Sequence, residues 1–188
     1  MEKGAFRKQQ IARLSQLSAT ERVQQNLDLQ RQLVATTAWQ QASVIATTIS
    51  SEIEVATRPI IELAWAAGKQ VVIPKTLPHR QMAFMPYTPE SQLERTKFGI
   101  FEPTAGPTFL KTAIDLILVP GLGYSRAELA RIGFGGGYYD RYLADYQGIK
   151  LTLAFREMAF AQAEWPVDAY DILLDQLLVA KDGVHDES

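Results

Sequence analysis

The stretch "AIDLILVPGLGYSRAELARIGFGGGYYDRYL", residues 113–143, runs from an apolar segment through a glycine-rich loop into an aromatic and charged segment. Its apolar part predicts a short central strand, and "GYYDRYLADY", residues 137–146, predicts a helix. The glycine loop would then lie between the carboxyl end of a strand and the start of a helix. Open α/β sheets bind their ligands at that place, so the stretch predicts both a fold class and a site.

The same alternation of strands and helices extends along the chain. Further short strands are expected at residues 43–50, 69–75, 82–87, 149–155 and 175–180, and further helices at residues 6–18, 18–39, 58–68 and 156–165. This order predicts an α/β fold, a single domain with a mostly parallel central sheet flanked by helices and preceded by an N-terminal helical pair. We expect the domain to span residues 1–180, with a polar C-terminal tail at residues 181–188.

Local signals mark several helix ends. Ser18 and Glu21 fit the capping box S-x-x-E at the start of the second helix. Pro59 falls in the first turn of the helix at residues 58–68, and Gly68 is its expected end. Apolar residues recur at helical spacing in the N-terminal pair, namely Ile11, Leu14, Leu17, Val23, Leu27 and Leu33. Both of these helices are therefore expected to be amphipathic.

The composition narrows the class of protein. The chain has 188 residues and a formal net charge of -2 at pH 7, which argues against a general nucleic-acid binder. It has no cysteine, which excludes disulfides and thiolate metal sites. It has only two histidines, which argues against a histidine-based hydrolytic triad. The start, "MEKGAFRKQQ", lacks the apolar core of a signal peptide, and no apolar run reaches the roughly 18 residues that span a bilayer. We expect a cytoplasmic protein with neither a nucleic-acid nor a membrane partner.

Four glycines, Gly133, Gly135, Gly136 and Gly137, are crowded into five residues of the loop. Bare backbone amides before a helix N-terminus favour a phosphate, whereas a tight turn would need fewer glycines. The P-loop pattern G-x-x-x-x-G-K-[ST] is absent, and the pattern G-x-G-x-x-G fails because Tyr138 stands where the last glycine is required. A nucleotide loop is the favoured interpretation, and an NAD(P)-binding oxidoreductase is the alternative.

Asp140 follows the loop directly and admits two interpretations. A carboxylate repels phosphate, so its position is sensible if a divalent metal such as Mg²⁺ bridges the two. Alternatively, Asp140 only stabilises the start of the helix through capping or the helix dipole.

The segment "LVPGLGYSRAELARIGFGGGYYDRYL" resembles the signature of the 5-formyltetrahydrofolate cyclo-ligase family, also called methenyltetrahydrofolate synthetases. The resemblance runs nearly end to end. It includes "KGAFR" at residues 3–7, "EVATRPII" at residues 54–61, "FGIFEPT" at residues 98–104, and a late D-x-x-x-D pattern at Asp171 and Asp175. Three positions depart from the usual pattern. Met158 stands for a glutamine, Tyr170 stands for a histidine, and the usual threonine after the last strand is replaced near "LLVA", residues 177–180.

The resemblance implies an ATP-dependent enzyme. In the family's reaction the γ-phosphoryl group of ATP passes to the formyl oxygen of 5-formyltetrahydrofolate. N10 then closes the ring, and phosphate leaves to give 5,10-methenyltetrahydrofolate and ADP. The implied partners are these two small molecules, the implied metal is Mg²⁺, and we expect a monomer. A catalytically inactive folate- or nucleotide-binding regulator is a second alternative.

The resemblance also implies roles for individual residues. Those implied for ATP binding are Lys3, Arg7, Arg131, Gly133, Gly135, Gly136, Gly137, Tyr138 and Tyr139. Those implied for the folate are Glu54, Gly136 and Tyr138, and those for the metal are Asp140 and Asp171. Arg131 and Arg141 are the candidate catalytic cations, although one of them can instead bridge the fold. Lys3 and Arg7 lie four residues apart, so both face one side of a helix, and their alternative use is a solvated face. For Glu54 the alternative is an ordinary loop charge.

Overall fold

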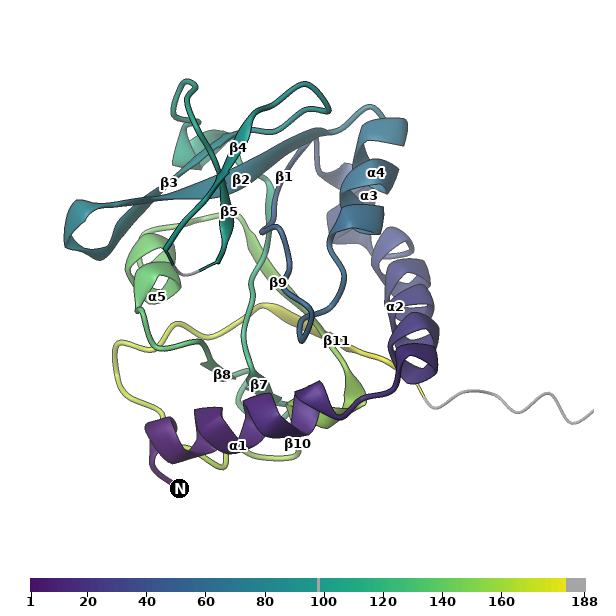
Figure 1. Ribbon diagram of the computed structural model, residues 1–188, viewed down its shortest axis with the longest axis vertical. Helices are drawn as coiled ribbons and strands as arrows, with labels where there is room; N and C mark the ends of the chain where they lie inside the picture. Colours follow the sequence, from purple (N-terminus) through teal and green to yellow (C-terminus); the bar gives the residue numbers. More distant parts are fainter. Residues whose placement is uncertain (98, 182–188) are drawn as a thin grey trace, which may run out of the picture.

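A central six-stranded sheet organises the computed structural model, which describes residues 1–97 and 99–181 (Figure 1). The strand order is β11-β9-β6-β1-β2-β3. These strands span Gln176–Val179, Ile149–Ala154, Leu116–Leu118, Val44–Ala46, Gln70–Leu77 and Gln81–Pro86 in that order. All neighbours pair in parallel except β2 and β3, which form an antiparallel hairpin. The predicted α/β fold with a mostly parallel sheet is therefore confirmed.

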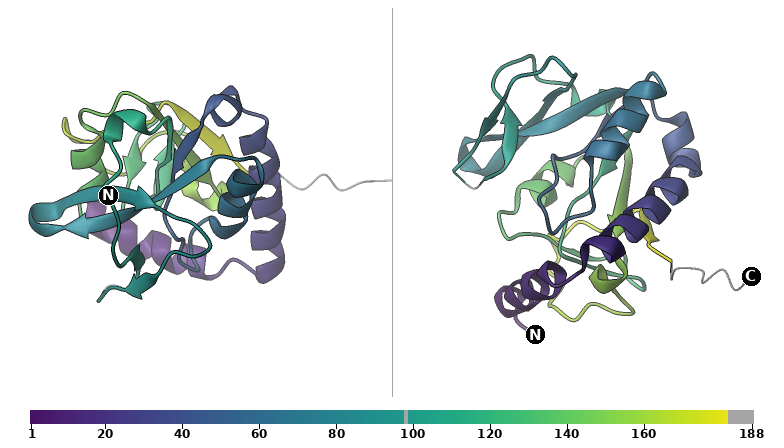
Figure 2. Two further views of the ribbon diagram at one scale, coloured as in Figure 1. Left: turned by 90° about the horizontal axis from the view of Figure 1, so that it is seen from above. Right: turned by 45° about the vertical axis from the view of Figure 1, so that its right-hand side comes forward.

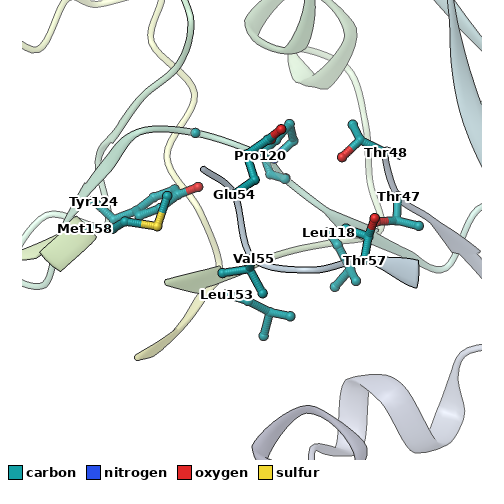
Figure 3. A pocket seen from close by; sticks show the side chains of 12 residues that line it. Thr47, Thr48, Glu54, Val55, Thr57, Leu118, Pro120, Tyr124, Leu153 and Met158 are labelled. Carbon is teal, nitrogen blue, oxygen red and sulfur yellow. The ribbon is translucent and has the colours of Figure 1, made fainter. Parts of the chain in front are cut away.

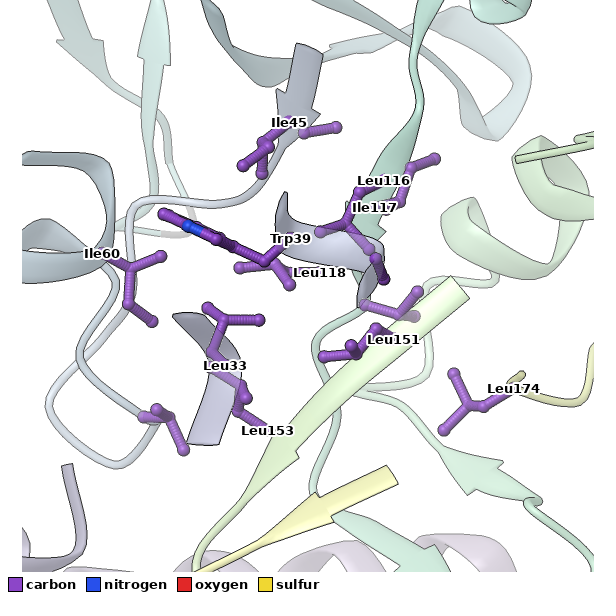
Figure 4. Close-up of a cluster of buried hydrophobic side chains, with 14 of the residues drawn as sticks. Leu33, Trp39, Ile45, Ile60, Leu116, Ile117, Leu118, Leu151, Leu153 and Leu174 are labelled. Carbon is purple, nitrogen blue, oxygen red and sulfur yellow. The ribbon is translucent and has the colours of Figure 1, made fainter. Parts of the chain in front are cut away.

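Helices cover both sides of this sheet. On one side lie α2 (Ala19–Val34), α3 (Thr37–Gln41) and α4 (Arg58–Ala66), and on the other lies α5 (Tyr138–Leu143), as Figures 1 and 2 show. The central strands β1 and β6 are fully buried. Side chains from the helices meet them in one core, where Leu33, Trp39 and Ile60 point toward the strands (Figure 4). A sheet covered on both faces explains the short, uniformly apolar strands of the sequence.

The local signals for helix ends agree with the structure, although the helix expected at residues 18–39 is divided into α2 and α3. The Ser18 hydroxyl accepts a hydrogen bond from the Glu21 backbone N–H, and the Glu21 carboxylate accepts one from the Ser18 N–H, which completes the capping box. Pro59 lies in the first turn of α4. Gly68 follows that helix with a φ of +72°, a conformation that glycine adopts readily.

The apolar pattern of the N-terminal helices predicted only some of their buried residues. Leu14 and Leu33 are buried as expected, but Ile11, Val23 and Leu27 are exposed. Helix α1 (Lys3–Ser15) and α2 instead bury one glutamine each. The Gln10 amide donates to the Leu122 and Glu157 carbonyls. Hydrogen bonds to backbone offset the cost of burying these polar side chains. The buried face of each helix is therefore turned away from the face that carries the apolar pattern.

One other segment differs from the expectation. Residues 156–165 were predicted to be helical, but only a short 3₁₀ turn, Arg156–Met158, forms there before strand β10 (Ala159–Phe160). Strand β10 pairs with β7 (Gly123–Ser125), which pairs in turn with β8 (Arg131–Ile132). Pairing with β7 extends the backbone of residues 159–160 and so overrides the local helical preference.

A separate two-stranded sheet, β4 (Leu93–Arg95) and β5 (Phe101–Pro103), lies against β2. The remaining short 3₁₀ turns are Pro78–Arg80 and Lys111–Ala113. The predicted polar tail lies, apart from Lys181, outside the described residues.

Candidate active site

The glycine loop reaches the carboxyl end of β6 by an indirect route. After β6 the chain passes through the antiparallel pair β7 and β8 before it enters the loop. The pair folds back, since the Leu122 N–H donates to the Ile132 carbonyl at 2.8 Å. The Arg131 guanidinium donates to the Pro120 carbonyl at 3.0 Å. The loop therefore begins beside the end of the central strand, although Arg131 comes eleven positions after Pro120 in the sequence.

Arg131 lies beneath the loop and is almost fully buried. Its guanidinium pairs with the Asp140 carboxylate at 3.0 Å. A Cβ on Gly133 would come within 2.5 Å of the same guanidinium, so this position requires glycine for close packing. The buried Arg131 guanidinium thus accounts for the glycine at position 133.

Helix α1 supplies two cations to the other side of the loop. The Arg7 Nε donates to the Gly133 carbonyl at 2.8 Å. The Lys3 ammonium contacts the carboxylates of Asp168 and Asp171 at 2.6 and 2.7 Å. The prediction that both cations face one way is confirmed, and neither belongs to a merely solvated face.

The same contacts explain the electrostatics of Lys3. Partial burial by itself lowers the pKa of Lys3, but hydrogen bonds and charge interactions with Asp168 and Asp171 together raise that pKa above its ordinary value. The hydrogen bond from Lys3 lowers the pKa of Asp168. Lys3 therefore stays charged over the physiological pH range, and two of its three N–H donors are used by carboxylates.

The Asp140 side chain lies against the segment that carries Asp171, although the two residues are far apart in sequence. The Ile172 N–H donates to the second Asp140 oxygen at 3.1 Å, which brings the residue after Asp171 onto Asp140. We call Lys3, Arg7, Arg131, Asp140 and Asp171 the charged cluster. No group of three or more histidine, aspartate or glutamate side chains capable of holding a metal occurs in residues 1–97 and 99–181.

Neither sequence interpretation of Asp140 described its contacts. The helix α5 begins after Gly137, which stands at the N-cap and makes no side-chain cap. Asp140 lies in the first turn and bridges Arg131 to the 172 backbone. Asp140 therefore has a structural role, the ion pair with Arg131.

Arg141 and the two tyrosines are placed differently from Arg131. Arg141 is exposed, and its guanidinium donates to the Gly137 carbonyl at 3.2 Å. Tyr138 packs beside Gly136, where a Cβ would lie 2.7 Å from the ring. The Tyr139 hydroxyl is buried with no hydrogen-bond partner, and burial together with the nearby Glu54 charge raises the pKa of Tyr139. Of the two candidate catalytic cations, only Arg131 belongs to the charged cluster.

A pocket opens beside the cluster at the carboxyl ends of β1 and β6 (Figure 3). Strand β1 lies between β2 and β6, and the chain continues from β1 to β2 on one side while β6 occupies the other. Such a reversal of strand order is where open α/β sheets bind ligands. The pocket encloses about 40 Å³ and is lined by Thr47, Thr48, Glu54, Val55, Thr57, Leu118, Val119, Pro120, Gly121, Tyr124, Leu153 and Met158. We call it the switch-point pocket.

Glu54 lies in the middle of this pocket. In Figure 3 the threonines lie on one side of it, and Tyr124 and Met158 lie on the other. The Glu54 carboxylate accepts hydrogen bonds from the Ser51 N–H at 2.8 Å and the Ser51 hydroxyl at 2.7 Å. Burial nevertheless raises the pKa of Glu54. Its place in a pocket argues against an ordinary loop charge.

Unsatisfied polar atoms gather around the same region. Among the described residues, five side chains bury an N or O atom without a partner, and three of them are Thr47, Arg131 and Tyr139. Buried polar atoms are nearly always hydrogen-bonded, so such a concentration marks a place where a ligand can complete the bonding.

Sequence reasoning missed three residues of these two sites. Asp168 shares Lys3 with Asp171, and Tyr124 and Thr47 line the pocket. A threonine directly after an apolar strand was a usable signal for Thr47, because the ends of parallel strands carry ligand-binding residues. Nothing local distinguishes Asp168. Asp175, by contrast, binds Lys150 and fixes β11 beside β9, so it lies outside both sites.

Comparisons with known proteins identify the family of this chain. The model of the 5-formyltetrahydrofolate cyclo-ligase family matches residues 1–180. The chain belongs to the 5-formyltetrahydrofolate cyclo-ligase family. A mouse 5-formyltetrahydrofolate cyclo-ligase is 34% identical over 180 residues, which cover 88% of this chain and 87% of the relative. The cyclo-ligase of Escherichia coli K12 is 30% identical over 138 residues, covering 71% of this chain and 75% of the relative.

Solved structures of the cyclo-ligase family have the same fold. The 5,10-methenyltetrahydrofolate synthetase of Aquifex aeolicus superposes with a TM-score of 0.82 and 26% identity, covering 100% of both chains. The synthetase of Mycoplasma pneumoniae superposes with a TM-score of 0.76 and 26% identity, covering 95% of this chain and 98% of the other. Within the described part of the chain, no helix combines the length and apolar character needed to cross a membrane.

Proposed function

We propose that this chain converts 5-formyltetrahydrofolate to 5,10-methenyltetrahydrofolate with consumption of ATP and release of ADP and phosphate. One observation supports this most directly. The fold gathers Lys3, Arg7 and Asp171, which come from opposite ends of the chain, around the glycine loop that carries the family signature. A site assembled from such distant segments is hard to explain as packing alone.

The charged cluster is the proposed nucleotide side of the site. Lys3, Arg7 and Arg131 would balance the charge of the triphosphate, and the backbone amides of the glycine loop would hydrogen-bond its oxygens. Gly135 and Gly137 support this use, because both adopt positive φ, at +105° and +70°. Arg131 is the stronger candidate for the cation at the transferred phosphoryl group, since Arg141 points to the loop backbone from an exposed position.

Two carboxylates fit the chemistry of Mg²⁺. Mg²⁺ in phosphoryl-transfer sites takes one or two carboxylates and completes its shell with water and phosphate oxygens. Asp140 and Asp171 offer that number of carboxylates in one region, with their charges now balanced by Arg131 and Lys3. When bound, the metal would neutralise charge on the phosphates. Asp140 and Asp171 would hold it, and Lys3 would turn from Asp171 to the nucleotide.

The switch-point pocket is the proposed folate side. Glu54 supplies a carboxylate that can accept hydrogen bonds from ring N–H groups. Gly136 and Tyr138 would meet the formyl group between the pocket and the loop. The formyl group is an amide, so N10 cannot expel its oxygen until that oxygen is phosphorylated. The residues therefore need to align two substrates and balance charge, and no histidine base is required.

An absorbance assay for the methenyl product tests the proposal. Product should form only when ATP, Mg²⁺ and 5-formyltetrahydrofolate are present together. Binding of NAD(P)H without product would favour the oxidoreductase alternative, and ligand-induced thermal stabilisation without turnover would favour an inactive regulator. We also propose a monomer and a cytoplasmic location, which size-exclusion chromatography with light scattering and cell fractionation would test.

A further inference from the structure

Thr47 is a buried residue of the switch-point pocket, and the proposed function assigns it no role. It follows β1 directly, and its N–H donates to the Val72 carbonyl at 3.0 Å, so its backbone continues the sheet. Its side chain is 1% exposed, and its hydroxyl has no hydrogen-bond partner. A hydroxyl can donate one hydrogen bond and accept two, and leaving all of them unmade destabilises a folded protein.

Neighbouring threonines do not share this property. Thr57, which also lines the pocket, accepts from the Ser50 N–H at 3.0 Å. Thr152, which is equally buried, donates to the Val119 carbonyl. The unsatisfied hydroxyl is therefore specific to Thr47 among these three residues. Its position at the β1–β6 reversal, in a cavity that also holds Glu54, points to a ligand rather than to a packing defect.

The size of the cavity limits what can reach this hydroxyl. The pocket is partly open, and its volume of about 40 Å³ holds a few water-sized polar groups but not a whole fused aromatic ring. The fitting occupant is the polar edge of a heteroaromatic ring whose body lies outside the enclosed space. Such an edge carries N–H and C=O groups, which a threonine hydroxyl can accept from or donate to.

We infer that the Thr47 hydroxyl is a specificity-determining contact for the ring edge of the folate substrate. This inference rests on the proposed function. It predicts an unusual combination of effects for Thr47→Val, which keeps the shape and removes the hydroxyl. The variant should bind substrate more weakly, yet be as stable as the wild type or more stable, because no bond within the protein is lost.

Calorimetric titration with 5-formyltetrahydrofolate in the absence of ATP measures the first effect. We expect the Kd to rise about 5- to 20-fold in Thr47→Val and to stay within about twofold in Thr47→Ser, which retains a hydroxyl. The KM for ATP should not change in either variant. An unchanged folate Kd in Thr47→Val overturns the inference.

Thermal melting measures the second effect, with Thr152→Val as the matched control. That control removes a hydroxyl that is bonded within the protein, so its melting temperature should fall. A fall of the same size in Thr47→Val would mean that the hydroxyl serves the fold, through a bridging water for instance, and would overturn the inference. Wild type that binds the folate without forming product refutes the proposed reaction but leaves the comparison of Kd values valid.

Discussion

The charged cluster and the switch-point pocket are adjacent, but they differ in whether their polar groups have partners within the protein. Pro120 joins them, since it lines the pocket and its carbonyl accepts from Arg131. In the cluster the charged groups are paired with one another or with backbone, although the buried Arg131 Nε has no partner among the described residues. In the pocket the Thr47 hydroxyl has no partner and Glu54 is held only by Ser51. An unpaired buried charge is far more costly than an unpaired hydroxyl, which explains the difference.

The two regions differ in what a ligand gains when it binds. Ligands of the cluster must exchange existing ion pairs for new ones, so much of the gain is offset by what is broken. A ligand of the pocket gives partners to groups that have none. We therefore expect substitutions in the cluster to disturb stability and activity together, and substitutions in the pocket to separate them.

The largest effect is expected for Gly136→Val. The new side chain would meet the Tyr138 ring at 2.7 Å and displace either the ring or the loop. Misplacing the loop amides should lower turnover by roughly 100-fold or more while the core remains folded. Activity measured beside circular dichroism checks this. Gly4→Ala is a suitable control, because a Cβ there meets nothing within 4 Å. A fully active variant would refute the role of the loop, and an unfolded one would indicate a purely structural turn.

Asp140→Asn tests whether the cluster holds a metal. The ion pair with Arg131 would be lost, and the free energy of unfolding should fall by about 1 to 3 kcal/mol, less than for a fully buried pair because Asp140 is 24% exposed. If Asp140 also holds Mg²⁺, the metal concentration for half-maximal rate should rise, and turnover should fall by roughly 100-fold. A magnesium titration of the initial rate and a thermal melt separate the two. An unchanged titration with a lowered melting temperature would leave Asp140 only the ion pair.

Lys3→Ala and Arg7→Ala test the α1 side of the cluster. Each should weaken ATP binding by roughly 1 to 3 kcal/mol, the range for a lost charge-assisted contact. Folate affinity should change less. Arg58→Ala is the matched control, since Arg58 pairs with Glu62 on the exposed face of α4. If titration calorimetry gave the same ATP affinity for wild type and both variants, helix α1 would not belong to the nucleotide site.

The raised pKa of Glu54 predicts a pH dependence on the pocket side. Burial favours the protonated form, so this carboxyl contributes stability at low pH that is lost as pH rises through its folded pKa. Substrate N–H groups need the ionised form. The Kd for 5-formyltetrahydrofolate should therefore rise as pH falls through that pKa, which lies above the ordinary 4.5. Glu54→Gln should bind more weakly at neutral pH and lose this dependence. A pH profile shared by wild type and Glu54→Gln would exclude the carboxylate as the contact.

The smallest effect is expected far from both regions. Ser18→Ala removes the hydroxyl of the capping box, which should lower the melting temperature by about 2–4 °C. Kinetic constants should not change, because Ser18 lies at the exposed start of α2, whereas the contact of this helix with the pocket segment is made by Asn26, which accepts from the Ala56 N–H. A loss of activity in this variant would show that the start of helix α2 influences the site.

Much of the fold could be predicted because it depends on local patterns. Apolar runs bounded by turn residues gave the strands, and the Ser18 box and Pro59 marked helix starts, since caps and first turns depend on residues a few positions apart. The predicted helix at residues 156–165 was wrong for the opposite reason. Pairing of residues 159–160 with β7 is a contact between distant segments, and no local signal encodes it.

For the site, the sequence by itself determined which chemical groups are present. The glycine loop and Asp140 could be named from residue type and spacing, because a loop that approaches phosphate needs bare backbone. Lys3, Arg7, Glu54 and Asp171 were named through the resemblance to the family. The sequence also determined that Lys3 and Arg7 share a helix face, since the helix repeat fixes that.

Only the tertiary structure decided which of these groups meet. Lys3 pairs with Asp168 and Asp171 across more than 160 residues, Arg131 rather than Arg141 lies under the loop, and Thr47 is left with an unsatisfied hydroxyl. Each outcome depends on how the β1, β6 and α1 segments pack together. Distances between side chains and the exclusion of water from a hydroxyl are properties of the packed chain, and spacing along the sequence does not contain them.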